Sequence, residues 1–143
     1  MMTSEKTLQR FINAQQSDYQ IAFSEIKQGK KQGHWMWYIF PQIQGLGFSD
    51  TSRFYAIRDM QEAEEYLDHP ILGVRIVLIS NELLKLEETD AVKIFGNPDY
   101  LKLKSSMTLF AMVANTHTVF QSVLDKFFGG EQDEKTLKII SHL

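Results

Sequence analysis

Residues 30–56 read KKQGHWMWYIFPQIQGLGFSDTSRFYA, and the rest of the chain is organised around this stretch. It holds both tryptophans, Trp35 and Trp37, and three of the eight glycines. Residues 35–40 form one continuous apolar run, so hydrophobic periodicity does not distinguish a strand from a short helix there. Pro41 ends the run. A short helix is favoured, because no other segment of the chain offers a partner strand.

On the N-terminal side of this stretch, two short helices are expected. Thr3 or Ser4 caps the first, and Ser17 caps the second. Gly29 is the natural stop of the second helix, because glycine adopts the left-handed conformation that commonly ends helices.

The C-terminal side reads as amphipathic helices joined by short links. The residues expected to cap them are, in chain order, Ser49 or Asp50, Asp59, Thr89, Asn97, Thr116 and Asp133. Residues 70 to about 86 carry a wide apolar stripe and are expected to form the central helix. The helix after Asn97 is expected to run to about residue 114, and Gly129 is expected to stop the helix after Thr116. The sequence therefore predicts an all-α fold, a single domain over residues 1–143 with about seven to nine short helices.

Length, charge and composition narrow the classes of function. A formal net charge of −3 over 143 residues argues against binding to a nucleic-acid duplex or an anionic membrane surface. The absence of cysteine removes thiol catalysis, disulfides and thiolate metal ligands. The four histidines show no paired metal-ligand spacing, so neither a metal nor a cofactor is expected. No signal core or membrane-length apolar run is found, and a cytoplasmic location is expected.

The first candidate for chemistry is the run His34, Trp35, Met36, Trp37. An imidazole among tryptophans is suited to stacking on a base or a peptide, and histidine titrates near neutral pH. The alternative is that both tryptophans belong to the core. Two residues two apart on a helix point about 200° from each other. We therefore expect one tryptophan to be buried and the other to line a groove.

The second candidate is the glycine-rich loop at residues 44–48, which leads into a helix start with Arg53 in its first turns. Such a loop, followed by hydroxyls and an arginine, is an arrangement that anion sites use. It matches neither the dinucleotide fingerprint nor the phosphate loop. An ordinary turn followed by a capped helix explains the same residues.

The third candidate is KLKSSMT at residues 102–108, in the middle of an expected helix. Ser105 and Ser106 are poor helix-interior residues, because their hydroxyls compete for backbone partners. Lys102 and Ser106 are four residues apart and share a helix face. The strip is either a place of close helix packing or one wall of a site.

Five blocks along the chain carry a resemblance to a known family. They are HWMWYIFPQIQGLG, SRFYAI, YLDHPILGVR, IFGNPDYLKLKSSMTLFA and VLDKFFGGEQDEKTL. The order and the amino-acid sequences of these blocks resemble the domain of unknown function 1810 family, over about residues 8–140. The resemblance implies a small, mainly helical, bacterial-type domain with no established activity and no catalytic residue to carry over. Some members bear the label calpastatin, but no residue pattern here supports protease inhibition.

Two hypotheses of function come from these residues, and a third needs no pocket. In the first, the protein binds an anionic or nucleotide-like small molecule, or a peptide. The residues of that site are His34, Trp35, Trp37, Gln42, Arg53, Tyr55, Lys102, Ser105 and Ser106. In the second, an N-glycosidase or phosphate-ester hydrolase uses His34 as acid and base. In the third, the exposed aromatic residues form a protein-interaction module. The catalytic residues and the oligomeric state are not predicted.

Overall fold

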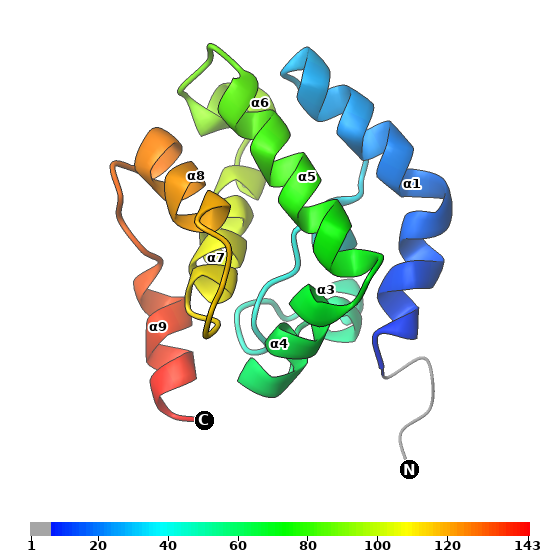
Figure 1. Ribbon diagram of the computed structural model, residues 1–143, viewed down its shortest axis with the longest axis vertical. Coiled ribbons are helices and arrows are strands. Elements are labelled where there is room, and N and C mark those ends of the chain that lie inside the picture. The colour runs from blue at the N-terminus through cyan, green and yellow to red at the C-terminus, as the bar shows by residue number, and fades with distance from the viewer. Residues whose placement is uncertain (1–6) are drawn as a thin grey trace.

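The computed structural model describes residues 7–143, and every regular element in that range is a helix (Figure 1). The helices are α1 (Gln9–Gln28), α2 (Met36–Ile39), α3 (Asp50–Tyr55), α4 (Met60–Asp68), α5 (Leu72–Lys85), α6 (Ala91–Phe95), α7 (Asp99–Ala111), α8 (Val119–Phe128) and α9 (Glu134–Ser141). Strand-type pairing in this range is limited to an isolated parallel bridge between Ile43 and Ile57. The all-α prediction is confirmed. Thr3 and Ser4, the expected first caps, lie outside the described residues.

Helix α5 lies at the centre of the fold, as its wide apolar stripe predicts. It packs against α1, α4 and α8, and Figure 1 shows it crossing the middle of the molecule between α1 and α8. Helix α7 packs in turn against α6, α8 and α9. Helices α1 and α9 therefore lie on opposite sides of the molecule.

The break expected at Ser17 is wrong, because α1 continues through it as one helix. The Ser17 hydroxyl donates to Asp18 Oδ1 at 3.2 Å instead of capping a new helix. The buried residues of α1 keep one helical phase along its whole length: Arg10, Phe11, Gln15, Ala22 and Ile26. Packing along this face outweighs the local capping preference of a serine.

Three of the expected caps form as the sequence indicates. Ser49, Asp59 and Asp133 each accept a hydrogen bond from the backbone N–H three residues later, at 2.9 to 3.1 Å. Gly29 and Gly129 end α1 and α8 in the left-handed conformation, as predicted. These signals succeed because each involves residues within one helical turn.

Helices α6 and α7 begin differently from the prediction. Asp90 caps α6 in place of Thr89, because Asp90 Oδ1 accepts a hydrogen bond from the Val92 N–H at 2.9 Å. Helix α7 begins at Asp99 with no side-chain cap, so Asn97 does not have the expected role.

The expected cap of α8 serves another helix. The Thr116 hydroxyl donates to the Phe110 carbonyl at 2.7 Å, and α7 ends at Ala111 rather than near residue 114. Helix α8 then starts at Val119 without a side-chain cap. Thr116 therefore closes the turn between the two helices.

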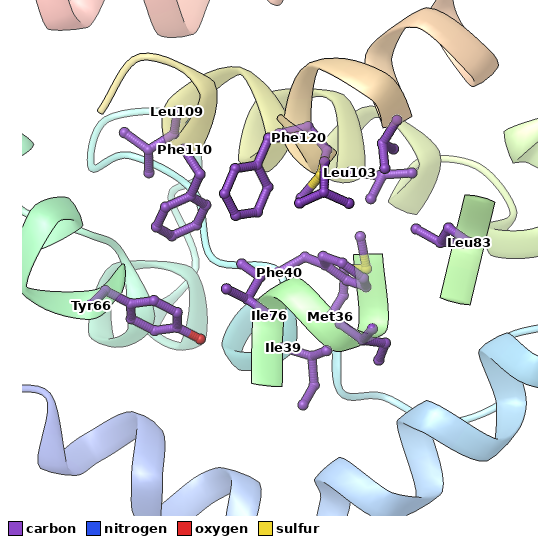
Figure 2. Close-up of a cluster of buried hydrophobic side chains, with 14 of the residues drawn as sticks. Met36, Ile39, Phe40, Tyr66, Ile76, Leu83, Leu103, Leu109, Phe110 and Phe120 are labelled. Atoms are coloured by element: carbon purple, nitrogen blue, oxygen red, sulfur yellow. The ribbon is translucent and has the colours of Figure 1, made fainter. Parts of the chain in front are cut away.

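The apolar run of the central stretch lies in the core as the single-turn helix α2. In Figure 2, Met36, Ile39 and Phe40 lie among core side chains contributed by α5, α7 and α8. These are Ile76, Leu83, Leu103, Leu109, Phe110 and Phe120, and all are buried. Burying each such side chain contributes roughly 1.5 to 3 kcal/mol relative to leaving it exposed. None of the helices within residues 7–143 is long and apolar enough to cross a membrane.

Arg10 and Glu62 form a buried ion pair between α1 and α4. Arg10 Nη2 lies 2.9 Å from Glu62 Oε1, and the two side chains are 2% and 1% exposed. The guanidinium also donates to the carbonyls of Phe54 and Ala56, while Arg58 Nη2 lies 3.0 Å from Glu62 Oε2. The pair thus joins α1, α4 and the end of α3, because the Arg10 guanidinium donates hydrogen bonds to groups of both α4 and the end of α3.

Candidate functional site

A pocket of about 790 Å³ lies where α7, the start of α9 and the loop before α3 meet. We call it the α7–α9 pocket. Its walls include Gln42, Lys102 and Ser105, three of the residues that the sequence places in a site. A second hollow of about 820 Å³ lies between the start of α1 and α4. Two of its three carboxylates already serve the fold, because Glu62 is in the buried ion pair and Asp59 caps α4, while the third, Glu65, is exposed.

Helix α7 gives the pocket its basic wall. Leu101, Lys102 and Ser105 lie on the pocket side, while Leu103 and Met107 lie in the core. This division follows helical spacing, since residues three and four apart share a face. The strip KLKSSMT therefore serves both purposes that its composition allows, a pocket wall and close helix packing.

Lys102 is held in place by an aromatic ring and a carboxylate. Its ammonium lies 5.0 Å from the centre of the Trp37 ring and 3.1 Å from Asp99 Oδ1. The other Asp99 oxygen lies 2.9 Å from Lys31 Nζ, and Lys31 lies 5.2 Å from the centre of the Trp35 ring. Two lysines and two tryptophans thus meet around one carboxylate.

The surroundings of Asp99 change its acidity. Burial alone raises the pKa of Asp99, but the hydrogen bonds and charges of Lys31 and Lys102 outweigh it and hold this pKa below its ordinary value of 3.8. Asp99 is therefore ionised at neutral pH and keeps the Lys102 ammonium at the edge of the pocket.

Asp133 joins α9 to α7 at the floor of the pocket. Its Oδ2 accepts hydrogen bonds from the Thr136 N–H at 3.0 Å and from the Ser105 hydroxyl at 3.2 Å. The backbone N–H of Asp133 donates to Thr108 Oγ1 at 2.8 Å. The Ser105 hydroxyl also lies 3.1 Å from the Leu101 carbonyl, so its single proton is shared between two acceptors. Asp133 is thereby both a helix cap and part of the site.

The pocket is lined by equal numbers of lysines and carboxylates: Lys102, Lys104, Lys135, Glu131, Asp133 and Glu134. Lys104 pairs with Glu131 at 3.6 Å, but the Glu131 side chain is 72% exposed. An exposed pair of this kind is worth about 0–1 kcal/mol. Lys135 forms no ion pair with any residue of 7–143. Lys104 and Lys135 are therefore the cations most readily available to a ligand.

The glycine-rich loop shapes the pocket. Leu46, Gly47 and Ser52 line it, and a Cβ at Gly47 would lie only 2.5 Å from the Ser52 Cβ. The Ser49 hydroxyl caps the Ser52 N–H and also donates to Ser52 Oγ at 2.9 Å. The Ser49 hydroxyl therefore serves the first turn of α3. Arg53 is exposed and does not line the pocket.

The two tryptophans differ in exposure, as their spacing predicts. Trp35 is 1% exposed, and its indole N–H donates to Glu25 Oε1 at 2.8 Å. The same oxygen accepts the backbone N–H groups of Gln32 and Gly33 at 2.8 and 2.9 Å. Trp35 is therefore a core residue. Trp37 is half-buried and contacts Lys102 of the pocket wall, but it does not itself line the α7–α9 pocket.

Three further candidates lie outside the pocket lining. His34 is exposed. Ser106 is fully buried, and its hydroxyl has no hydrogen-bond partner among the described residues. Tyr55 packs against Tyr38, with ring centres 5.0 Å apart. Burial and the nearby carboxylate of Asp18 raise the pKa of Tyr55.

Several pocket residues escape notice in the sequence. Asp133 is recognised there as a helix cap, but nothing in the sequence signals its bond to Ser105, 28 residues away. Lys104 lies inside the KLKSSMT strip, but the sequence prediction selected Lys102, Ser105 and Ser106 from that strip instead. Ser52 is one of the hydroxyls that follow the glycine-rich loop, whereas Lys135 carries no signal beyond an ordinary helix position. Among residues 7–143, no cluster of three or more histidine, aspartate or glutamate side chains is arranged to hold a metal ion.

Fold and site together define an all-helical protein with a mixed-charge pocket between α7 and α9. Over residues 5–140 the sequence matches the family described as protein of unknown function (DUF1810), and the chain belongs to that family. It is similar to the conserved hypothetical protein Rv1873 from Mycobacterium tuberculosis, whose crystal structure superposes with a TM-score of 0.92 at 40% sequence identity. The match covers 94% of this chain and 96% of the other. No curated protein matches the sequence significantly.

Proposed function

We propose that the protein binds a small polar molecule carrying an anionic group in the α7–α9 pocket. The observation that carries this proposal is the convergence of Lys102 and Lys104 from α7 with Lys135 from α9 on one pocket of about 790 Å³. The hydroxyls of Ser52 and Ser105 line the same pocket. Lysines with neighbouring hydroxyls suit a phosphate or carboxylate, and a pocket of this volume matches a nucleotide-sized ligand.

The carboxylates of the pocket are compatible with an anionic ligand. Asp133 is occupied as the cap of α9 and the partner of Ser105. Glu131 is largely exposed, and its pair with Lys104 is weak. A ligand anion displaces Glu131 from Lys104 at little cost in free energy. Glu134, which forms no ion pair with any residue of 7–143, can accept a hydrogen bond from a ligand hydroxyl or amine.

The geometry supports binding rather than catalysis. A general base has to come within hydrogen-bond reach of the proton that it abstracts. His34 is exposed and lies outside the pocket lining. Ser105 has a carboxylate beside it, Asp133, but no histidine or lysine is within hydrogen-bond distance of its hydroxyl among the described residues.

A thermal-shift screen tests the proposal. The compounds are nucleotides, sugar phosphates, NAD-related compounds and short peptides, and the proteins are the wild type and Lys104→Ala. A ligand at a hundred times its dissociation constant adds about 2.7 kcal/mol, which raises the melting temperature by several degrees. We expect a shift with an anionic compound that Lys104→Ala reduces.

Arg53→Ala is the matched control, because it removes an exposed cation on α3 that does not line the pocket. It should keep the full shift. A shift that is lost equally in Arg53→Ala and Lys104→Ala reports general electrostatic attraction and contradicts the proposal. So does a screen in which peptides without an anionic group give the only shifts.

A further inference from the structure

An apolar hollow of about 600 Å³ lies beside the α7–α9 pocket, between the glycine-rich loop and α9. It is lined by the apolar side chains of Leu46, Phe48 and Ile139 and by the basic side chains of Lys135, Lys138 and His142. The proposed binding mode uses Lys135 but none of the apolar side chains of this hollow. It shares two lining residues, Leu46 and Lys135, with the pocket. The two spaces are therefore adjacent.

The backbone at Gly45 holds the loop against α9. Its φ of +111° is a conformation that side-chain-bearing residues rarely adopt, and a Cβ there would lie 3.2 Å from Ile139 Cδ1. Phe48, three residues further along the loop, also lines the hollow and is 78% exposed. An exposed aromatic side chain next to an apolar hollow is a surface that a ligand ring can cover.

The ionisable side chains around the hollow are all of one kind. Every ionisable side chain that lines it is basic, and Lys135, Lys138 and His142 follow one another at intervals of three and four residues along one face of α9. Neither lysine forms an ion pair with any residue of 7–143. An apolar floor with a basic rim is complementary to a molecule that is both apolar and anionic.

We infer that the ligand is an aryl-bearing anion whose anionic group lies among Lys104 and Lys135 and whose ring lies in the hollow against Phe48. This inference rests on the proposed function and specifies its ligand class. The volumes agree with it, since a pocket of about 790 Å³ and a hollow of about 600 Å³ together exceed what a small anion fills.

Two probes that differ only in their apolar group test the inference. Methyl phosphate and 1-naphthyl phosphate are titrated separately into the ¹⁵N-labelled protein, and backbone amide shifts are followed by NMR. We expect 1-naphthyl phosphate to bind at least tenfold more tightly, with amide shifts at Leu46 and Lys135 for both probes. Shifts at Ile139 are expected for 1-naphthyl phosphate alone.

Variants separate the two halves of the site. Phe48→Ala should bring the affinity for 1-naphthyl phosphate down toward that for methyl phosphate and leave methyl phosphate binding unchanged. Leu78→Ala is the matched control, because Leu78 on α5 is 51% exposed and lines neither space. Lys104→Ala should weaken both probes.

The outcomes distinguish this inference from the proposed function. Equal affinities for the two probes, both reduced by Lys104→Ala, overturn the inference and leave the proposed function standing. Binding of 1-naphthyl phosphate that needs Phe48 but is indifferent to Lys104 makes the hollow a separate site and also overturns it. If neither probe changes the amide shifts around the pocket, both the inference and the proposed function are contradicted.

Discussion

Individual carboxylates position the groups around the candidate site. Glu25 accepts three hydrogen bonds from residues 32–35 and thereby holds the segment that precedes α2. Burial favours a higher pKa for Glu25, but its hydrogen bonds and Lys31 outweigh this and lower the pKa from 4.5. Asp99 likewise holds the ammonium groups of Lys31 and Lys102 in place. Because both carboxylates are stabilised in their ionised form, the local structure depends on pH.

The pH dependence of stability follows from the sign of the Asp99 shift. Its folded-state pKa is below the unfolded value of 3.8. Its contribution is therefore complete above that value and is lost as the pH falls through the folded-state pKa. We expect the free energy of unfolding, measured with urea below about pH 5, to fall less steeply with decreasing pH in Asp99→Asn than in the wild type.

Asp68→Asn, an exposed change on α4, is the control and should keep the wild-type slope of unfolding free energy against pH. Equal slopes in Asp99→Asn and the wild type would contradict the assignment.

At the scale of elements, the turn between α4 and α5 sets the position of the central helix. The helices meet at Gly73, where a Cβ would lie 2.0 Å from the Leu67 carbonyl oxygen and 2.8 Å from its carbon. Gly73 N–H also donates to the His69 carbonyl at 3.0 Å. A backbone carbonyl cannot move aside as the end of a side chain can. Glycine at this position is what allows α5 to start so close to α4.

Gly73→Ala tests this contact by the direction of its effect. In an ordinary helix interior, alanine is more favourable than glycine by about 1 kcal/mol. Here we expect a loss of about 1–3 kcal/mol in the free energy of unfolding, because the added methyl overpacks against backbone. Urea denaturation followed by far-UV circular dichroism measures it. Val74→Ala changes a half-exposed neighbour and should stay within about 1 kcal/mol of the wild type. A Gly73→Ala protein as stable as the wild type would show that the helices separate freely.

At the scale of the whole molecule, one core joins the first helix to the last third of the chain. The buried cluster includes Phe11 from α1, Ile79 from α5 and Phe120 from α8. The Arg10–Glu62 pair closes the side of this core between α1 and α4. A single connected core of this kind favours cooperative unfolding.

Removing the charge of Glu62 should therefore weaken the whole fold at once. Glu62→Gln leaves a buried guanidinium without its counter-charge, and we expect a loss of about 3–5 kcal/mol. Tryptophan fluorescence reports residues 35 and 37, while far-UV circular dichroism reports all helices, and the two urea midpoints should fall together. Glu64→Gln, an exposed change on α4, is the control and should shift neither by more than about 0.5 kcal/mol. Separate midpoints would indicate independent folding units.

The sequence predicted those features that depend on near neighbours. The caps at Ser49, Asp59 and Asp133 and the stop at Gly29 each involve residues within one turn. The predicted break at Ser17 was wrong, because α1 packs against distant helices along its whole length and this packing keeps it continuous. Local preference and tertiary packing compete at such positions, and packing has the larger free energy.

The candidate site was predictable only in part for the same reason. Residue type and helical spacing pointed to the strip that holds Lys102 and Ser105, and the fold brings both to one pocket with the loop residue Gln42. Residue type also selected Trp35, although its polar atom is satisfied by Glu25, ten residues away. The roles of Asp133 and Lys135 depend on where α9 docks, and no local pattern encodes that.

By itself, the sequence determined the helical class, several helix ends and the central place of α5. These follow from apolar periodicity and from side chains that bond to their own turn of backbone. The tertiary structure alone decided which polar residues meet. Lys104 and Lys135 come together because α9 is fastened to α7 through Thr108, Ser105 and Asp133. The physical reason is one of distance along the chain: local hydrogen bonds act within a few residues, whereas a pocket is formed by side chains that only packing brings into contact.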